Sequence, residues 1–171
     1  MDKERVTAAQ RGDRDAYTQL VRDHYRTVFV TCLAVVGNPH DAEDLAQEVF
    51  ITGLKCLRQL RESERFTAWI TQIARNHSIN LLRNKRRLKM KAEQLKLKPR
   101  GQEATHSIEV ERALQHLPLE LREPLVLHYF AGQTVKSIAA CLNLSASHVY
   151  QRLRTAHQQL RQLLVQQGDV S

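Results

Sequence analysis

Long apolar runs and aromatic residues are scarce in this 171-residue sequence. The longest nearly apolar run extends from Val28 to Val36 and is interrupted by Thr31, far below the roughly 20 residues that a membrane-spanning helix needs. Only 5% of the residues are aromatic, and six Gly and four Pro are too few for a fibrous or low-complexity protein. Because 42% of the residues are nonetheless hydrophobic, the composition predicts a globular chain with a packed core.

Cysteines are few, and they are widely separated among apolar residues. Cys32, Cys56 and Cys141 are therefore interpreted as small buried hydrophobic residues, with a disulfide or a metal site as the alternative. The first five residues, MDKER, are followed by no apolar core of a signal peptide. We therefore expect a cytoplasmic protein.

Positive charge is concentrated in one stretch of the chain. Residues 1–74 carry ten basic and eleven acidic side chains, residues 75–100 carry ten basic and one acidic, and residues 101–171 carry six of each. Such a segment favours a polyanion as partner, because each phosphate that it neutralises releases condensed counterions. A solvated basic helix face without a partner is the alternative.

Apolar residues at helical spacing predict three helices in the first half of the chain. The first has its core face at Tyr17, Leu20, Val21, Tyr25, Val28, Phe29, Cys32 and Val36, and Asn38-Pro39 ends it. The second begins at Asp41 as N-cap and buries Ala42, Leu45, Ala46, Val49, Phe50 and Leu57. After a polar stretch, the third runs into the basic segment and buries Phe66, Trp69, Ile70, Ile73, Ala74 and Leu81.

The apolar period is lost from Leu88 to about His106, where Lys, Pro99 and Gly101 occur instead. This pattern predicts an interdomain linker. Strand-like alternation is absent from the whole sequence, so the expected fold class is all-α. We expect two helical domains, residues 1–88 and 107–171, joined by a flexible linker at 89–106. They should fold separately and change their relative orientation on binding.

The C-terminal half contains the pattern of a helix-turn-helix. Thr134 can cap a short helix, Asn143 tolerates the left-handed conformation at its end, and Ser145 can cap the next helix. The outward side of that next helix carries Ser147, His148, Tyr150, Gln151, Arg154, Thr155 and His157. The functional interpretation places this helix in a major groove, and the alternative is an ordinary helical hairpin in a bundle.

A second polar face lies on the predicted helix that follows Asp41. By the 3.6-residue period, Asp44, Gln47, Glu48 and Ile51 lie opposite the Leu45/Val49 stripe. A catalytic carboxylate pair is one possible use, but no nucleophile, metal cluster or phosphate-binding loop is near in the sequence. A docking face for a protein partner fits better.

The motifs together resemble a known family. The run DAEDLAQEVF at 41–50, FTAWI at 66–70, IARN at 73–76 and the basic residues from Arg83 to Arg87 resemble region 2 of the extracytoplasmic-function sigma factors of bacterial RNA polymerase. The segment LPLELREPLVLHYFAG at 117–132 and the helix-turn-helix after it resemble region 4. The similarity covers nearly the entire chain in the right order.

The resemblance implies a two-domain initiation factor without cofactors. Its partners would be core RNA polymerase, through the coiled coil of the largest subunit and the flap, promoter DNA and an anti-sigma factor. Region 2 would capture the melted −10 element and region 4 would hold the −35 element.

The resemblance also assigns roles to residues of this sequence. It matches Asp44, Gln47, Glu48 and Ile51 with polymerase docking. It matches the loop from Leu60 to Arg65 and the helix after it with −10 recognition, through Leu60, Arg61, Ser63, Arg65, Asn76, Asn80, Arg83, Lys85, Arg86 and Arg87. The −35 set is Ser145, Ser147, His148, Tyr150, Gln151, Arg152, Arg154 and Thr155. Trp69 is interpreted mainly as a packing residue, with base stacking as the alternative.

Two alternative functions from other classes fit the sequence less well. A free-standing helix-turn-helix regulator would account for the C-terminal half but would leave the Asp44/Glu48 face without a use. The eight histidines form no HxxxH pair and have no cysteine partner in the sequence, so an enzyme with metal or hydrolytic chemistry is not expected. In the recognition helix the family commonly has Arg at the places of Thr155 and His157, so the promoter sequence does not follow from the resemblance.

Overall fold

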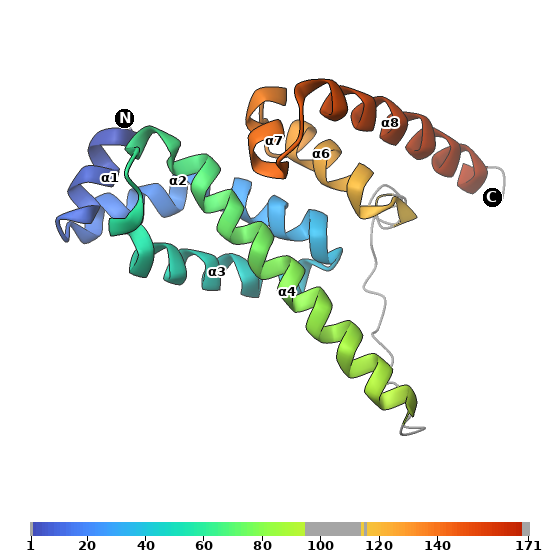
Figure 1. Cartoon of the computed structure of the whole chain (residues 1–171), viewed down its shortest axis with the longest axis horizontal. Helices are drawn as coiled ribbons and strands as arrows, with labels where there is room; N and C mark the ends of the chain where they lie inside the picture. Colours follow the sequence, from blue (N-terminus) through green and yellow to red (C-terminus); the bar gives the residue numbers. More distant parts are fainter. Residues whose placement is uncertain (1, 95–113, 115, 169–171) are drawn as a thin grey trace.

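The computed structural model describes residues 2–94, 114 and 116–168, without the side chains of 92–94 and 164–168. It is all-α, as predicted (Figure 1). The N-terminal domain contains α1 (Asp2–Gln10), α2 (Arg14–Val36), α3 (Pro39–Cys56) and α4 (Phe66–Gln94), and the C-terminal domain contains α6 (Leu119–Tyr129), α7 (Val135–Leu142) and α8 (Ala146–Gly168). Within these residues, no helix is long and apolar enough to span a membrane.

The N-terminal domain is a bundle in which α2, α3 and α4 pack against one another and α1 packs on α2. The predicted stripe of α3 is buried throughout, as are Leu20, Phe66 and Ile70. Tyr25 is an exception, since it is 38% exposed and lies against Phe29 and Phe50 at the edge of the core. The sequence reasoning missed α1, which contributes the buried Val6 and Ala9.

The predicted N-cap of α3 is wrong by three residues. Asn38 is the N-cap, and its side-chain oxygen accepts hydrogen bonds from the backbone N–H groups of His40 and Asp41. Both Asn and Asp are favourable caps, and Pro39 at the first helical turn decides between them because it lacks the N–H that would be unsatisfied there. Gly37, at φ 71°, ends α2 in the left-handed conformation.

The predicted caps of the helix-turn-helix are confirmed. The Thr134 hydroxyl accepts from the Ser137 N–H at the start of α7, and Asn143 has φ 54° at its end. The Ser145 hydroxyl accepts from the His148 N–H at 3.3 Å at the start of α8. The inward side chains of α8 that were predicted to be core are buried or half-buried: Val149, Leu153, Ala156 and Leu160.

The first six residues of the predicted linker belong to α4, which continues to Gln94 and extends past the rest of the bundle (Figure 1). The remaining linker positions, 95–106, lie outside the described residues. The two domains are in contact, since α6 packs on α2 and α7 packs on α4. Val30 and Ala34 of α2 are buried in the same apolar cluster as Leu125, Val126 and the rest of the C-terminal core.

Candidate nucleic-acid interface

The face of α3 that was predicted to dock a protein is exposed at each of its four positions, Asp44, Gln47, Glu48 and Ile51. Ile51 is 55% exposed, and Leu54, one turn further, is 52% exposed. Because the opposite side of α3 is buried in the core, this side is left free for a partner. Leu54 was not predicted, although its i+3 spacing from Ile51 could have indicated it.

Two histidines lie beside the carboxylates of this face. The His40 Nδ1 is 3.4 Å from Asp44 Oδ2, and the His77 Nδ1 is 3.9 Å from Glu48 Oε2. Both carboxylates are well exposed, so these contacts are screened and leave the carboxylates accessible. The face therefore combines negative charge with exposed apolar surface.

The outer side of α4 carries the amide and guanidinium groups predicted for −10 recognition. Asn76, Asn80, Arg83, Arg86 and Arg87 are all exposed. The Gln72 side-chain amide donates to Asn76 Oδ1 at 3.2 Å, which restrains the Asn76 amide on the helix surface. Along α4, the exposed amides are thus followed by the exposed arginines.

Lys85 differs from its basic neighbours. Its ammonium donates to Asp41 Oδ2 at 2.5 Å, across from α4 to the first turn of α3, and both side chains are partly buried. This cation is already neutralised inside the domain, so it has less charge to offer a phosphate than Arg83 or Arg86.

The loop predicted to read bases is built from two short 3-10 turns, Leu57–Gln59 and Ser63–Arg65. Arg61 and Arg65 are exposed, and Ser63 is half-buried. Leu60 is 8% exposed and packs in the core. It was predicted as a DNA-contacting residue, but an apolar side chain buried in this way anchors the loop instead. Trp69 is half-buried beside Phe66, in keeping with its interpretation as a packing residue.

On α8, the predicted −35 residues fall on three sides of the helix. Ser147, Gln151 and Arg154 are exposed on the side opposite the buried Val149/Leu153 row. On one flank, Tyr150 is 63% exposed, and His157 is hydrogen-bonded to the Tyr129 hydroxyl at 2.8 Å.

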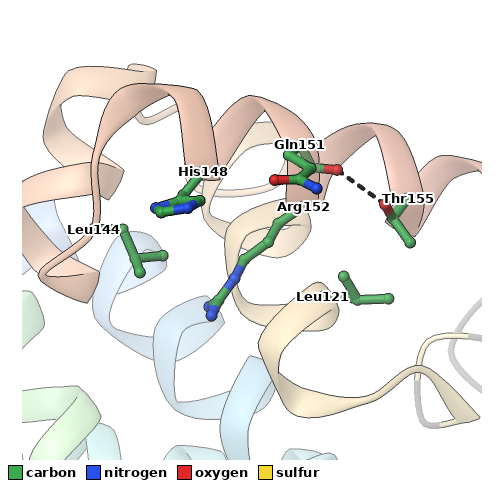
Figure 2. Close-up of a pocket in the computed structure, with 6 residues that line it drawn as sticks. All are labelled: Leu121, Leu144, His148, Gln151, Arg152 and Thr155. Carbon is green, nitrogen blue, oxygen red and sulfur yellow. Dashed lines mark hydrogen bonds between the residues drawn. The ribbon is translucent and has the colours of Figure 1, made fainter.

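The other flank of α8 borders a pocket of about 360 Å³ (Figure 2). The half-buried Arg152 extends into it, and the lining also includes Leu121, Leu144, His148, Gln151 and Thr155. The hydroxyl groups of two predicted contact residues are engaged locally, since Thr155 donates to the Gln151 carbonyl and Ser145 caps the helix. Ser147, Gln151 and Arg154 are thus the predicted contact residues that are exposed directly opposite the core.

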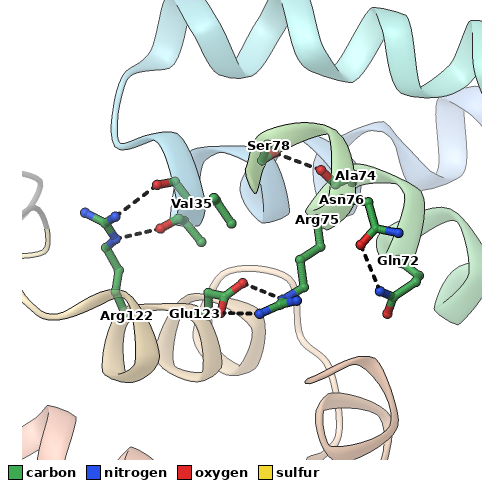
Figure 3. A network of polar contacts seen from close by, with 9 residues as sticks. Val35, Gln72, Ala74, Arg75, Asn76, Ser78, Arg122 and Glu123 are labelled. Atoms are coloured by element: carbon green, nitrogen blue, oxygen red, sulfur yellow. Dashed lines mark hydrogen bonds and ion pairs between the residues drawn. The ribbon is translucent and has the colours of Figure 1, made fainter. Parts of the chain in front are cut away.

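Between the domains lies a polar contact that the sequence reasoning missed (Figure 3). The Arg75 guanidinium of α4 donates to both carboxylate oxygens of Glu123 on α6, at 2.8 and 3.2 Å. Glu123 is only 4% exposed. Next to it, the Arg122 guanidinium donates to the carbonyl oxygens of Ala34 and Val35, at 2.6 and 3.0 Å.

The Arg122 contact has a clear physical basis. Carbonyl groups in the last turn of a helix have no partner within that helix, and the helix dipole favours a cation there. Ala34 and Val35 lie in the last turn of α2, so Arg122 satisfies carbonyl groups that burial would otherwise leave unpaired. Burial lowers the pKa of the Arg122 guanidinium, and Glu123 acts in the opposite direction.

The cysteines are unpaired, and Cys32 and Cys141 are buried while Cys56 is half-buried. Burial raises the pKa of the Cys32 thiol to about 11 and also raises that of Cys141. These thiols stay protonated at neutral pH, in keeping with their interpretation as small buried residues. Among the residues that the structure describes, no group of three or more His, Cys, Asp or Glu side chains could hold a metal ion.

Comparison with known proteins places both halves of the chain in one class. Residues 20–88 match the family model described as sigma-70 region 2, and residues 113–162 match sigma-70, region 4. These two ranges cover more than two-thirds of the chain, and they define a two-region factor of the sigma-70 class.

Individual relatives narrow the class to a family. The chain is 32% identical to the probable RNA polymerase sigma factor RfaY of Xanthomonas campestris pv. campestris over 94% of its own length, but spans only 43% of that relative. It is 26% identical to the ECF RNA polymerase sigma factor SigW of Bacillus subtilis, covering 96% of this chain and 97% of that protein. The chain belongs to the extracytoplasmic-function sigma factors.

A solved structure shares the fold. The sigma factor RpoE of Bartonella quintana, in complex with the anti-sigma factor NepR, aligns with a TM-score of 0.72 at 18% identity, covering 86% of this chain and 96% of that one.

Proposed function

We propose that this chain binds core RNA polymerase through the exposed face of α3 and directs it to promoters through α4 and α8. The observation that carries this proposal is the α3 face itself. Asp44, Gln47, Glu48 and Ile51 are exposed on a helix whose other side is entirely occupied by the core. A free helix-turn-helix regulator has no use for a second acidic and apolar face remote from its recognition helix.

The role proposed for α4 follows from the cost of opening DNA. A base must leave its stack before its pairing edge can be read, at a cost of a few kcal/mol. A protein offsets this cost by holding the extruded base and the flanking phosphates. The Asn76 amide has donors and acceptors for a base edge, and Arg83 and Arg86 lie two to three turns further along the same helix.

The role proposed for α8 is recognition of the −35 element in the major groove. Ser147, Gln151 and Arg154 are polar and exposed on the side of α8 opposite the core. Gln and Arg side chains can each form bidentate contacts with a base edge, and one such contact is worth about 1–3 kcal/mol of discrimination. The protein acts by binding rather than by catalysis, and we propose an anti-sigma factor as its regulator.

The proposal is tested by reversing the charge of the α3 face. The Asp44→Lys/Glu48→Lys chain should lose competition for core polymerase and promoter-directed transcription, while circular dichroism and thermal unfolding stay unchanged because exposed substitutions cost little stability. Each single reversal, Asp44→Lys and Glu48→Lys, is compared with Glu43→Lys as control, since Glu43 is exposed on the same helix about 100° from Asp44 and about 140° from Glu48 around the axis. A double variant that still competes as well as the parent would remove the docking assignment.

A further inference from the structure

The buried ion pair between the domains involves a residue of the proposed promoter-binding helix. Arg75 immediately precedes Asn76 on α4, and at 3.6 residues per turn it falls in nearly the same row as Arg86, three turns further on. In the structure the two domains are in contact, an arrangement called here the closed chain. In the closed chain the Arg75 guanidinium points toward Glu123 of α6 (Figure 3). Without this contact, Arg75 would add a guanidinium in the row of Arg86 at the base-reading end of the helix.

Glu123 engages this guanidinium as a phosphate would. Its two oxygens accept from Arg75 Nε and Nη2 at 2.8 and 3.2 Å, the fork geometry by which arginine binds both carboxylates and phosphates. The carboxylate is almost fully buried, whereas the Arg75 side chain keeps 25% of its exposure. The anion is thus supplied by region 4 and the cation by the DNA-facing helix of region 2.

The closed chain is too small to hold both promoter elements. Positions −10 and −35 are about 25 base pairs apart, which is about 85 Å of duplex at 3.4 Å per pair. In the structure the two domains are in direct contact, and the longest helix, α4, measures about 44 Å, about half of that distance. Binding both elements requires region 4 to leave region 2, and this separation breaks the Arg75–Glu123 pair.

We infer that Arg75 is a promoter-phosphate contact beside the −10 bases and that Glu123 occupies it, as an internal phosphate mimic, in the closed chain. This inference rests on the proposed function. Separation of the domains then exposes a cation at the place where the melted strand is held. The DNA backbone replaces the lost carboxylate, so closure and promoter binding compete for one guanidinium.

The first test measures the phosphate contact in holoenzyme. Equilibrium binding to a forked promoter with a single-stranded −10 element is followed from 50 to 300 mM salt. Arg75→Gln should lower the salt slope by about 0.7–0.9, the value for one phosphate, and weaken binding about sixfold at 100 mM. Arg22→Gln is the control, since Arg22 is exposed on α2, and its slope should equal that of the parent.

The second test removes the charges of the Arg75–Glu123 pair and measures both the salt slope of the holoenzyme and the compactness of the free chain. Arg75→Gln/Glu123→Gln removes both charges of the pair, so it should show the same loss of salt slope as Arg75→Gln without leaving a buried carboxylate unpaired. Glu123→Gln alone should keep the parental slope in holoenzyme but expand the free chain in small-angle X-ray scattering.

The outcomes separate this inference from the proposed function. A parental slope in both Arg75 variants would overturn the phosphate contact, and a Glu123→Gln chain as compact as the parent would overturn the competition. If the parent itself confers no promoter-specific binding on core polymerase, the proposed function fails, whatever Arg75 does.

Discussion

The two domains differ in how their cores are completed. Among the described residues, the core of the N-terminal domain draws only on its own helices, from Val6 to Ala74, with partly buried residues as far as Leu81. The core of the C-terminal domain also includes Val30 and Ala34 of α2. Region 2 therefore has a core made only of its own residues, whereas the core of region 4 depends on two residues, Val30 and Ala34, that region 2 contributes. Opening the chain should affect region 4 more than region 2.

The largest loss of stability is expected from a substitution in the core of region 2, which does not depend on region 4. Phe66 is fully buried, so Phe66→Ala should lower the free energy of unfolding by about 3–5 kcal/mol through lost burial and the cavity left behind. Urea unfolding can follow Trp69, the single tryptophan of the chain, which lies in region 2. Leu88→Ala, at a 67% exposed position, should stay within about 0.5 kcal/mol of the parent.

A smaller effect is expected from a charge in the shared apolar cluster. Ala34 is 2% exposed in the closed chain, so Ala34→Asp should shift the equilibrium at least tenfold toward the open form, about 1.4 kcal/mol, because a buried carboxylate is costly without a partner. Small-angle scattering should show expansion, and calorimetry should show a weaker region 4 transition with region 2 unchanged. Equal losses in both transitions would contradict the asymmetry between the domains.

The effect confined to the narrowest range of conditions appears only at alkaline pH and only in region 2. The Tyr17 hydroxyl donates to the Phe50 carbonyl at 2.5 Å, and burial raises the pKa of Tyr17 to about 12. An unfolded tyrosine has a pKa of about 10, so this stabilisation is present below pH 10 and is lost as the pH rises to 12. Tyr17→Phe should flatten the fall of region 2 stability across that range, measured by Trp69 fluorescence. A slope equal to that of the parent would exclude Tyr17 as its source.

The local structure was largely predictable because it depends on neighbouring residues. Thr134, Asn143 and Ser145 are close in sequence to the backbone groups that they serve, so the helix-turn-helix follows from the sequence with its caps in place. The exposed face of α3 follows from periodicity alone. Leu60 was misassigned because the loop assignment came from resemblance and took no account of its burial.

The contact between the domains was not predictable in the same way. Arg75 and Glu123 are 48 residues apart in the sequence, and each fits equally well on a solvated helix surface. Their pairing depends on how α6 packs on α2. Val30 and Ala34 make that contact, but in the sequence they look like any other apolar residues of a core-facing helix. Which polar residues become buried is therefore decided by tertiary packing.

Because α4 is long, a small change in its tilt displaces its C-terminal end by several ångströms. Its 29 residues contain neither proline nor glycine, so they form a rod of about 44 Å with no easy place to bend. The bundle holds this helix as far as the Lys85–Asp41 pair, Glu123 binds it at Arg75, the tenth of its 29 residues, and its C-terminal end projects past the bundle (Figure 1). Gln94 lies 19 residues, or about 28 Å, beyond Arg75, so a tilt of about 10° at Arg75 moves the end of the helix by roughly 5 Å. A small change in the Arg75–Glu123 contact can therefore move the basic C-terminal end of α4 by several ångströms.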